Sequence, residues 1–444
     1  MSPAQPEAPA ALAFPGTYPA AMAALGYLSV LGELLARGLP THRLPLADAG
    51  PPVSLEEGRP LRSYRIVGVS AAWELEAVEA VSALRRAGLE PDPARRGPDD
   101  PLVVAGGSLT LVNPRPLLAF ADAVAIGEGR TVAEVLARGV RRGAGRRELL
   151  DELGRLPHVA LAERADEAAL AERQAAAVAR YTAAPGPLAS PVVTETSAFG
   201  ESFLVEACRG CPRGCRFCVL RRDRCGPFVP FEAAAVAAAV PAETPRAGLV
   251  GAGISDHPAL EALLERLVER GIAVSTSSLR VASLTGRHLA LLARGGARQL
   301  TVGVDGLSER LREALGKPLP ARRVETLAEA ARAAGIEALK LYVMVGVPGE
   351  TPEDAAEFVE LARAAGRHVR LAVSATPLVP KPGTPLAGAP FAPAAELRER
   401  LDALRRGLGS LARLDLGSPR TAAREYALAH AGLAEARRLT GVTR

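Results

Sequence analysis

Short apolar segments alternate with helical segments throughout the second half of the chain, and this alternation most constrains the fold. The segments that we interpret as strands are 203–206, 248–251, 273–275, 299–304, 339–345 and 370–374. Helical patterns lie between them, for example at 257–270, 307–315 and 352–365. Strand–helix alternation predicts parallel strands, and six such units predict an α/β fold built as an open or partial (βα)6 barrel.

A similar alternation precedes the barrel. Apolar strands are expected at 64–70, 102–105 and 121–126, with helices at 20–37 and 73–88. Gly106-Gly107 and the run 127–129 (GEG) follow the second and third strands. Such glycines are typical of ligand sites in a doubly wound sheet, although plain tight turns explain them equally well. We therefore expect a doubly wound α/β domain.

These patterns divide the chain into consecutive parts. Residues 1–19 are rich in proline and alanine and are expected to form a loose tail. The predicted parts are a doubly wound domain at 20–140, a linker at 141–200, the barrel at 201–390 and a helical C-terminal cap at 391–444. The basic run at 141–147 is interpreted as a solvated turn of the linker, and an alanine- and glutamate-rich helix and a proline-rich stretch that ends near Pro191 are expected to follow it.

Composition excludes some classes of protein. Five cysteines in 444 residues exclude a disulfide-stapled secreted scaffold, and a net charge of +5 does not indicate nucleic acid. No charge lies between Glu7 and Glu33, but prolines interrupt this run, and what remains, 20–32, is too short to span a bilayer. No basic residue precedes it, so a signal peptide is not expected and the protein is predicted to be cytoplasmic.

Lysine is rare in this chain. The 54 basic residues include only Lys317, Lys340 and Lys381, and the rest are arginines. A G+C-rich coding bias explains the arginines and makes each remaining lysine more informative. Prolines on both sides of Lys381 hold its backbone, and we expect its ammonium to contact an anionic group of substrate or cofactor at the barrel mouth.

Four of the five cysteines lie within eleven residues, at the end of the first barrel strand. They are Cys208, Cys211, Cys215 and Cys218. A zinc ribbon needs two pairs separated by a longer spacer, and a disulfide does not suit a reducing compartment. A [4Fe–4S] cluster fits the spacing best, with Cys211, Cys215 and Cys218 on three irons and the fourth iron open. Cys208 and Cys225 are not expected to be ligands.

The C-x3-C-x2-C spacing, with Phe217 before the last cysteine, resembles the radical S-adenosylmethionine (SAM) superfamily. The resemblance continues through VGAGI at 250–254, Leu279-Arg280, 303–312, 340–350 and VPKPGTP at 379–385. It implies a [4Fe–4S] cluster, SAM and an electron donor of the ferredoxin or flavodoxin type. It also implies that SAM is bound by Phe217, Gly251, Ala252, Gly253, Arg280, Asp305, Ser308, Met344 and Gly346. Asp305 stands where the family motif has a glutamate.

The first half of the chain resembles the flavodoxin-like, cobalamin-binding type of domain that precedes the barrel in some of these proteins. The residues that carry this likeness are 58–61, 68–74, 105–107, Asn113-Pro114 and 126–129. The D-x-H-x-x-G signature of cobalamin ligation is absent, so a cofactor-free scaffold and cobalamin held without a histidine both remain open. No cysteine precedes Cys208, which argues against the second cluster of methylthiotransferases.

The resemblance implies an enzyme that cleaves SAM reductively to a 5′-deoxyadenosyl radical or, if cobalamin is bound, methylates a substrate that the sequence does not identify. The alternative is a non-catalytic iron–sulfur protein on the same scaffold. An arginine-rich RNA-binding module is less consistent with 4 % aromatic residues, because single-stranded RNA is bound largely by aromatic stacking. No membrane partner is expected.

Overall fold

The computed structural model describes residues 8–47, 49–181 and 186–443 and divides the chain into two compact units. The N-terminal unit comprises the chain up to Tyr181, Leu188–Glu201 and the C-terminal segment from Ala427. The barrel unit comprises Ser202–Tyr426. Much of the segment expected as a linker therefore belongs to the first unit. The segment expected as a cap on the barrel is divided between the two.

The N-terminal unit is built on a six-stranded sheet with the order β2-β1-β3-β4-β5-β6. All neighbouring strands are parallel except β6, which pairs antiparallel with β5. This order is flavodoxin-like, and its topological switch point lies between β1 and β3. The strands are β1 (Ala10–Phe14), β2 (Thr41–Pro45), β3 (Ile66–Ser70), β4 (Leu102–Gly106), β5 (Ala123–Ala125) and β6 (Val159–Leu161). The predicted doubly wound domain is confirmed.

Helices cover both faces of this sheet, and each face has its own apolar core. One core joins the sheet to α3 (Glu74–Arg86), α4 (Arg115–Leu118) and α7 (Glu167–Ala179). The other joins it to α2 (Leu25–Ala36), α5 (Arg130–Arg141) and α6 (Arg146–Gly154). Alternate residues of each strand enter opposite cores, as Val103 and Val104 of β4 do. Burial on both faces explains why the inner strands β1, β4 and β5 are continuously apolar, whereas the edge strand β2 carries polar residues.

Strand β2 was not predicted, and other sequence-based expectations in this unit need correction. The predicted tail contains β1, which pairs with β2 and β3 and is buried along its whole length. The predicted linker contains α6 and β6, which were not expected, besides the alanine- and glutamate-rich helix that was expected and is α7. The helix expected at 20–37 is two helices, α1 (Tyr18–Ala21) and α2. No helix in the described part of the chain is both long and apolar enough to cross a membrane.

The barrel unit contains seven parallel strands in two sheets, ordered β11-β10-β7 and β12-β13-β14-β15. A parallel bridge between Leu279 and Val302 joins them. The strands are β7 (Phe203–Glu206), β10 (Arg246–Val250), β11 (Ala273–Thr276), β12 (Gln299–Asp305), β13 (Ala338–Val345), β14 (Arg370–Pro377) and β15 (Ala412–Leu416). The six predicted strands are confirmed. The seventh, β15, was expected to be helical, because its alternating arginine, leucine and aspartate resemble the neighbouring helices.

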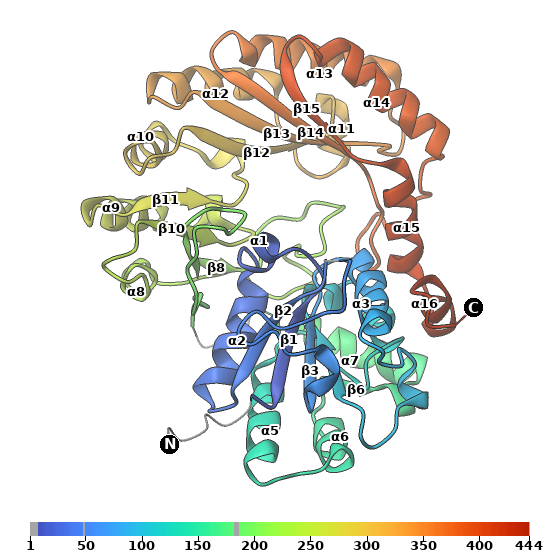
Figure 1. The fold of residues 1–444 in the computed structure, drawn as a ribbon. Helices are drawn as coiled ribbons and strands as arrows, with labels where there is room; N and C mark the ends of the chain where they lie inside the picture. The colour runs from blue at the N-terminus through green and yellow to red at the C-terminus, as the bar shows by residue number, and fades with distance from the viewer. Residues whose placement is uncertain (1–7, 48, 182–185, 444) are drawn as a thin grey trace. The chain divides into compact units, whose positions relative to one another are not determined.

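Helices follow the strands of the barrel unit. They are α8 (Ala233–Ala239), α9 (Leu260–Glu269), α10 (Gly286–Arg294), α11 (Glu309–Ala314), α12 (Ala321–Ala333), α13 (Pro352–Gly366), α14 (Ala394–Leu408) and α15 (Pro419–His430). Helices α12, α13 and α14 lie along one face of the β12–β15 sheet (Figure 1). The chain ends with α16 (Leu433–Leu439), which packs on α4 of the N-terminal unit.

Asn113, the only asparagine in the chain, attaches the C-terminal segment to the N-terminal unit. Its buried amide nitrogen lies 2.9–3.1 Å from the carbonyl oxygens of Leu428, Ala429 and Ala431. Its Oδ1 accepts a hydrogen bond from the backbone of Arg115 at 3.1 Å. These carbonyls lie at the end of α15, where a helix leaves acceptors without partners inside the helix.

Asn113→Ala is expected to lower the free energy of unfolding of the N-terminal unit by about 2 kcal/mol, because it leaves buried carbonyl groups without a donor. Asn113→Asp is expected to be at least as destabilising, since a carboxylate cannot donate. Urea unfolding followed by circular dichroism measures both. Ser29→Ala, which removes an exposed hydroxyl from α2, is the control. Wild-type stability in Asn113→Asp would contradict the donor role.

Candidate active site

A loop that carries three cysteines begins at the carboxyl end of β7. Its base is closed by a short antiparallel pairing of β8 (Cys208–Arg209) with β9 (Val229–Pro230). Arg209 and Glu206 form a buried two-point ion pair there, with N–O distances of 2.7 and 2.9 Å. The loop therefore leaves the sheet from a rigid base.

Cys208 differs from the other cysteines of the cluster. It is 1 % exposed, and burial raises the pKa of its thiol to about 12. A Cβ atom added to Gly251 would lie 2.4 Å from its Sγ, so the sulfur packs against the backbone that follows β10. Cys225 is also buried, and its thiol donates to the carbonyl of Val219 at 3.1 Å. Both behave as packed core residues.

Cys211, Cys215 and Cys218 are free and half-buried in the loop. Burial is the main cause that raises the pKa of the Cys218 thiol to about 11, and the negative charges of Cys211 and Cys215 contribute to the same shift. No three histidine, cysteine, aspartate or glutamate side chains among the described residues converge on a single metal ion. A cubane cluster does not need such convergence, because each thiolate binds a different iron. The donor set therefore fits a [4Fe–4S] cluster.

The segment after β10 packs directly against this loop. A Cβ atom on Gly253 would lie 2.6 Å from the ring of Phe228 and 3.2 Å from Pro212, so only glycine permits this approach. Ala252, between the two glycines, is exposed. The hydroxyl of Ser277, beyond β11, donates to the carbonyl of Gly251 at 3.2 Å. The ends of β7, β10 and β11 are thereby joined.

Arg280, predicted to bind SAM, lies beside this junction. Its backbone N–H donates to the hydroxyl of Ser255 at 2.8 Å. Its charge, together with that of Arg213 from the cysteine loop, helps to keep the pKa of Asp256 low despite burial. The Nε atom of Arg280 is buried and has no hydrogen-bond partner among the described residues. A donor in this state fits an anionic ligand such as a carboxylate, because an unpaired buried donor costs free energy.

Arg216 attaches the other side of the cysteine loop to the end of α11. Its backbone N–H donates to the carbonyl of Leu315 at 2.9 Å, and its guanidinium donates to that of Ala314 at 3.2 Å. The next residues of this turn lead to Lys317, whose ammonium donates to the carbonyl of Gly303 at 2.8 Å and pairs with Asp305. Sequence reasoning did not assign Lys317 to this site, although the rarity of lysine marks it.

Asp305, predicted to bind SAM, ends β12 in an unusual backbone conformation. Its φ of 66° makes it the only residue other than glycine with a positive φ in the described ranges. The pairing of β12 with β13 shifts register between Gly303 and Asp305. The ammonium of Lys317 contacts Gly303 on one side of this irregularity and Asp305 on the other, and so holds the carboxylate of Asp305 in place.

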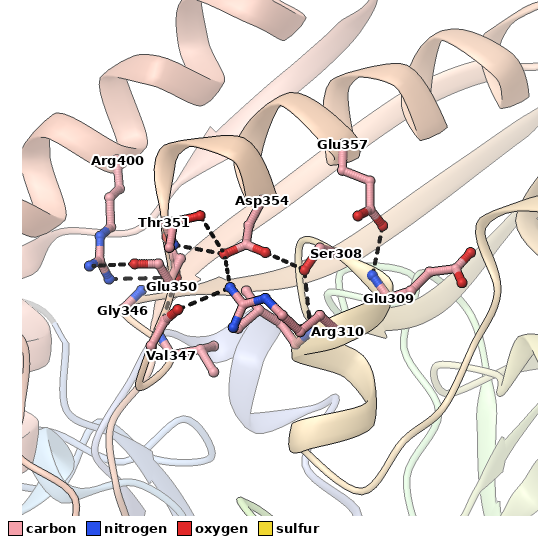
Figure 2. A network of polar contacts seen from close by, with 12 residues as sticks. Ser308, Glu309, Arg310, Gly346, Val347, Glu350, Thr351, Asp354, Glu357 and Arg400 are labelled. Atoms are coloured by element: carbon pink, nitrogen blue, oxygen red, sulfur yellow. Dashed lines mark hydrogen bonds and ion pairs between the residues drawn. The ribbon is translucent and has the colours of Figure 1, made fainter.

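Ser308 and Gly346 belong to a polar network that fixes the loop after β13 (Figure 2). Ser308 caps α11 and donates to Asp354, which also accepts from the backbone of Thr351 at 2.7 Å. Burial opposes the ionisation of Asp354, but the bonds from Ser308 and Thr351 and the charge of Arg310 lower its pKa overall. The Ser308 hydroxyl therefore already donates its hydrogen to Asp354 within the protein.

Glu350 holds the first residues of the same loop. Its Oε2 accepts from the backbones of Gly346 at 2.7 Å and Val347 at 3.1 Å, and lies 3.6 Å from Arg400 (Figure 2). Burial raises the pKa of Glu350. The α-carbon of Gly346 faces α14, since an added Cβ would lie 2.7 Å from Leu397. The hydrogen bonds of Ser308 with Asp354 and of Gly346 with Glu350 hold the protein's own loops. Contacts of these two residues with SAM stay predictions.

The remaining predicted residues are more dispersed. Phe217 lies within the cysteine loop and Met344 near the end of β13, and both are half-buried. Lys381 donates to Glu425 of α15 at 2.7 Å, and both side chains are largely buried. The anionic partner of Lys381 in this structure is thus a carboxylate of the protein itself, and the expected contact with substrate or cofactor stays a prediction.

Comparison with known proteins supports both halves of the architecture. The profile of the N-terminal region of radical SAM proteins matches residues 43–161, and that of the radical SAM superfamily matches residues 205–362. An uncharacterized protein of Methanocaldococcus jannaschii is 32 % identical over 208 residues, which are 45 % of each chain. The chain thus spans less than half the length of the relative that it matches.

Two solved structures share most of the fold. The radical SAM methyltransferase TsrM from Kitasatospora setae, with cobalamin and a [4Fe–4S] cluster bound, superposes with a TM-score of 0.62 and 17 % identity and covers 98 % of both chains. The cobalamin-dependent SAM radical enzyme OxsB superposes with a TM-score of 0.51 and 12 % identity, over 83 % of this chain and 53 % of its own. With a cysteine loop at the end of β7 and both profiles matched, the chain belongs to the radical SAM superfamily of enzymes.

Proposed function

We propose that the protein binds a [4Fe–4S] cluster through Cys211, Cys215 and Cys218 and cleaves SAM reductively at the barrel mouth. The observation that carries this proposal is the position of the three half-buried thiols, on a loop packed against the segment after β10 and the turn after α11. When bound, the cluster supplies one electron that breaks the C5′–S bond of SAM and yields methionine and a 5′-deoxyadenosyl radical.

The residues of this chain have separate tasks in that reaction. The buried Nε of Arg280 and the carboxylate of Asp305 offer opposite charges for the polar groups of SAM. Arg216 and Gly253 hold the cysteine loop against neighbouring loops and limit its movement. The barrel keeps the reacting atoms aligned and dry, which is the main contribution that protein makes to cofactor chemistry.

A non-catalytic iron–sulfur protein on the same scaffold is the competing function. It would keep the cluster but have no use for a carboxylate in a strained conformation at the end of β12 or for an unpaired buried arginine nitrogen. Formation of 5′-deoxyadenosine by the anaerobically reconstituted, reduced protein distinguishes the two functions. Cluster without any deoxyadenosine would favour the non-catalytic scaffold.

Cys211→Ala, Cys215→Ala and Cys218→Ala are each expected to lose the cluster, because each removes the ligand of one iron. Iron content, roughly four per chain in the wild type, and visible absorption measure the loss after anaerobic reconstitution. Cys225→Ala and Cys208→Ala are the matched controls and should keep full iron content, since both thiols are packed in the core. A full cluster in Cys215→Ala, or its loss in Cys225→Ala, contradicts the assignment.

Lys317→Met is expected to weaken SAM binding about tenfold while iron content stays at the wild-type level, because Asp305 loses the charged group that positions it. Anaerobic calorimetry measures the affinity. The matched control is Arg287→Met, which breaks an exposed ion pair with Glu265 on the helices outside the sheet. Unchanged SAM affinity in Lys317→Met would remove this pair from the SAM site.

A second candidate function adds cobalamin to this chemistry, so that a methyl group is transferred. It is favoured by the flavodoxin-like strand order of the N-terminal unit and by its likeness, across 98 % of the chain, to a methyltransferase with cobalamin bound. His42 bonds Tyr64 at 2.8 Å and His158 bonds Thr131 at 3.0 Å, so both histidines that precede the cysteine loop have partners within the protein. Cobalamin would then be held without either of them.

The loops after β3 and β4 offer the surface for such a group. Gly107, with a φ of 112°, brings its backbone so close to Ala71 that an added Cβ would lie 2.2 Å from the carbonyl oxygen of that residue. Trp73, the only tryptophan in the chain, is 38 % exposed directly after β3. A flat aromatic surface at the end of a strand next to the switch point suits a large planar cofactor.

Trp73→Ala is expected to lower the affinity for hydroxocobalamin about tenfold, because it removes aromatic contact area. Cobalamin retained per chain after gel filtration, measured by absorption, reports the change. Leu35→Ala, which shortens another exposed apolar side chain of the same unit, is the control. If the wild type retains no cobalamin, the methyl-transfer candidate is wrong and the first proposal stands.

A further inference from the structure

Strand β13 exposes polar side chains in the middle of a parallel sheet. Leu339, Leu341, Val343 and Val345 point to one side and are buried. Lys340, Tyr342 and Met344 point to the other side, and Tyr342 is 37 % exposed. Parallel sheets are normally covered on both faces, so an open face on a strand that is paired on both sides needs an explanation. Because the helices cover the opposite face, this face lies inside the barrel.

The neighbours of Lys340 and Tyr342 on this face have small side chains. The register places Tyr342 between Gly303 of β12 and Ser374 of β14. It places Lys340 between Thr301 and Ala372. None of these four neighbours has a side chain large enough to cover a tyrosine ring, and Ala372 and Ser374 are themselves buried, so it is the ring of Tyr342 that is exposed at this point of the face.

The seventh strand adds a negative charge to the same face. Asp415 of β15 lies opposite Ser374, whose hydroxyl donates to Asp415 Oδ2 at 3.1 Å. Lys340 Nζ lies 4.0 Å from the same Oδ2 and 5.0 Å from the centroid of the Tyr342 ring. The ammonium of Lys340, the carboxylate of Asp415 and the ring of Tyr342 therefore lie close to one another on this face.

The ion pair on this face is looser than those of the other two lysines. Lys317 and Lys381 contact their carboxylates directly and are largely buried with them. Lys340 and Asp415 are separated by 4.0 Å, and the side chain of Asp415 is 74 % exposed while that of Lys340 is 22 % exposed. A pair at this separation with one partner exposed contributes little to stability, so neither charge is committed to a direct contact with the other.

We propose that this face binds an aromatic amino acid as a zwitterion, with its carboxylate on Lys340, its ammonium on Asp415 and its ring against Tyr342. This rests on the proposed function, because it places the acceptor of the SAM-dependent reaction in the barrel. The carboxylate of Asp415 repels a ligand that has only a negative charge, and the ammonium of Lys340 repels a ligand that has only a positive charge. The pair thus selects a molecule with both charges.

Equilibrium dialysis with labelled phenylalanine, tyrosine and tryptophan tests the site on the full-length, anaerobically reconstituted protein without reductant. At least one of the three should bind. Its analogue without the carboxylate (phenethylamine, tyramine or tryptamine) and its analogue without the amine (3-phenylpropionate or the corresponding acid) should compete at least tenfold more weakly. Because no turnover occurs, failure to form 5′-deoxyadenosine counts against the proposed function and leaves this result unaffected.

Two charge-removing variants assign the contacts. Lys340→Met should weaken binding of the amino acid and of the acid analogue at least tenfold and leave the amine analogue unchanged. Asp415→Asn should do the reverse. Arg370→Met and Glu337→Gln, which remove the exposed pair joined at 2.8 Å at the opposite end of the same sheet, are matched controls, and thermal unfolding verifies folding. Binding of none of the three amino acids, or wild-type binding in both site variants, overturns the proposal.

Discussion

The common direction of the seven strands in the barrel unit decides where the chemistry of this protein lies. Parallel strands bring their carboxyl ends to one edge. The cysteine loop after β7, the Gly251–Gly253 segment after β10, Arg280 beyond β11 and Asp305 at the end of β12 therefore meet, although about a hundred residues separate the first from the last. No single segment forms the site, and each loop is held by contacts with its neighbours.

The contact between Lys317 and Asp305 illustrates how these loops depend on one another. A residue other than glycine with a positive φ costs of order 1–3 kcal/mol and persists only where its surroundings hold it. Here the surroundings are an ammonium that bonds both Asp305 and the carbonyl of Gly303. Lys317 follows the turn that anchors Arg216, so the cysteine loop and the end of β12 share one support. A substitution in the cysteine loop or at the end of β12 can therefore alter the other through only a few residues.

The three lysines show what composition alone can predict and what it cannot. In a chain that otherwise uses arginine, each lysine lies in the barrel unit and faces a carboxylate. A compact ammonium fits beside Gly303, where a planar guanidinium would need more room. Composition marked these positions as informative, but it could not identify partners, and the partner of Lys381 is Glu425 of the protein itself.

Local patterns in the sequence determined the class of fold, six of the seven barrel strands and the cysteines suited to an iron–sulfur cluster, because periodicity and ligand spacing are properties of neighbouring residues. Strands β1, β2, β6 and β15 escaped prediction, since each is a strand only through pairing with distant segments. The tertiary structure alone decided which residues meet at the strand ends, how Cys208 and Cys225 are packed and which lysine lies apart from its carboxylate. Those outcomes depend on register, burial and the geometry of pairing, which arise only once the chain has folded.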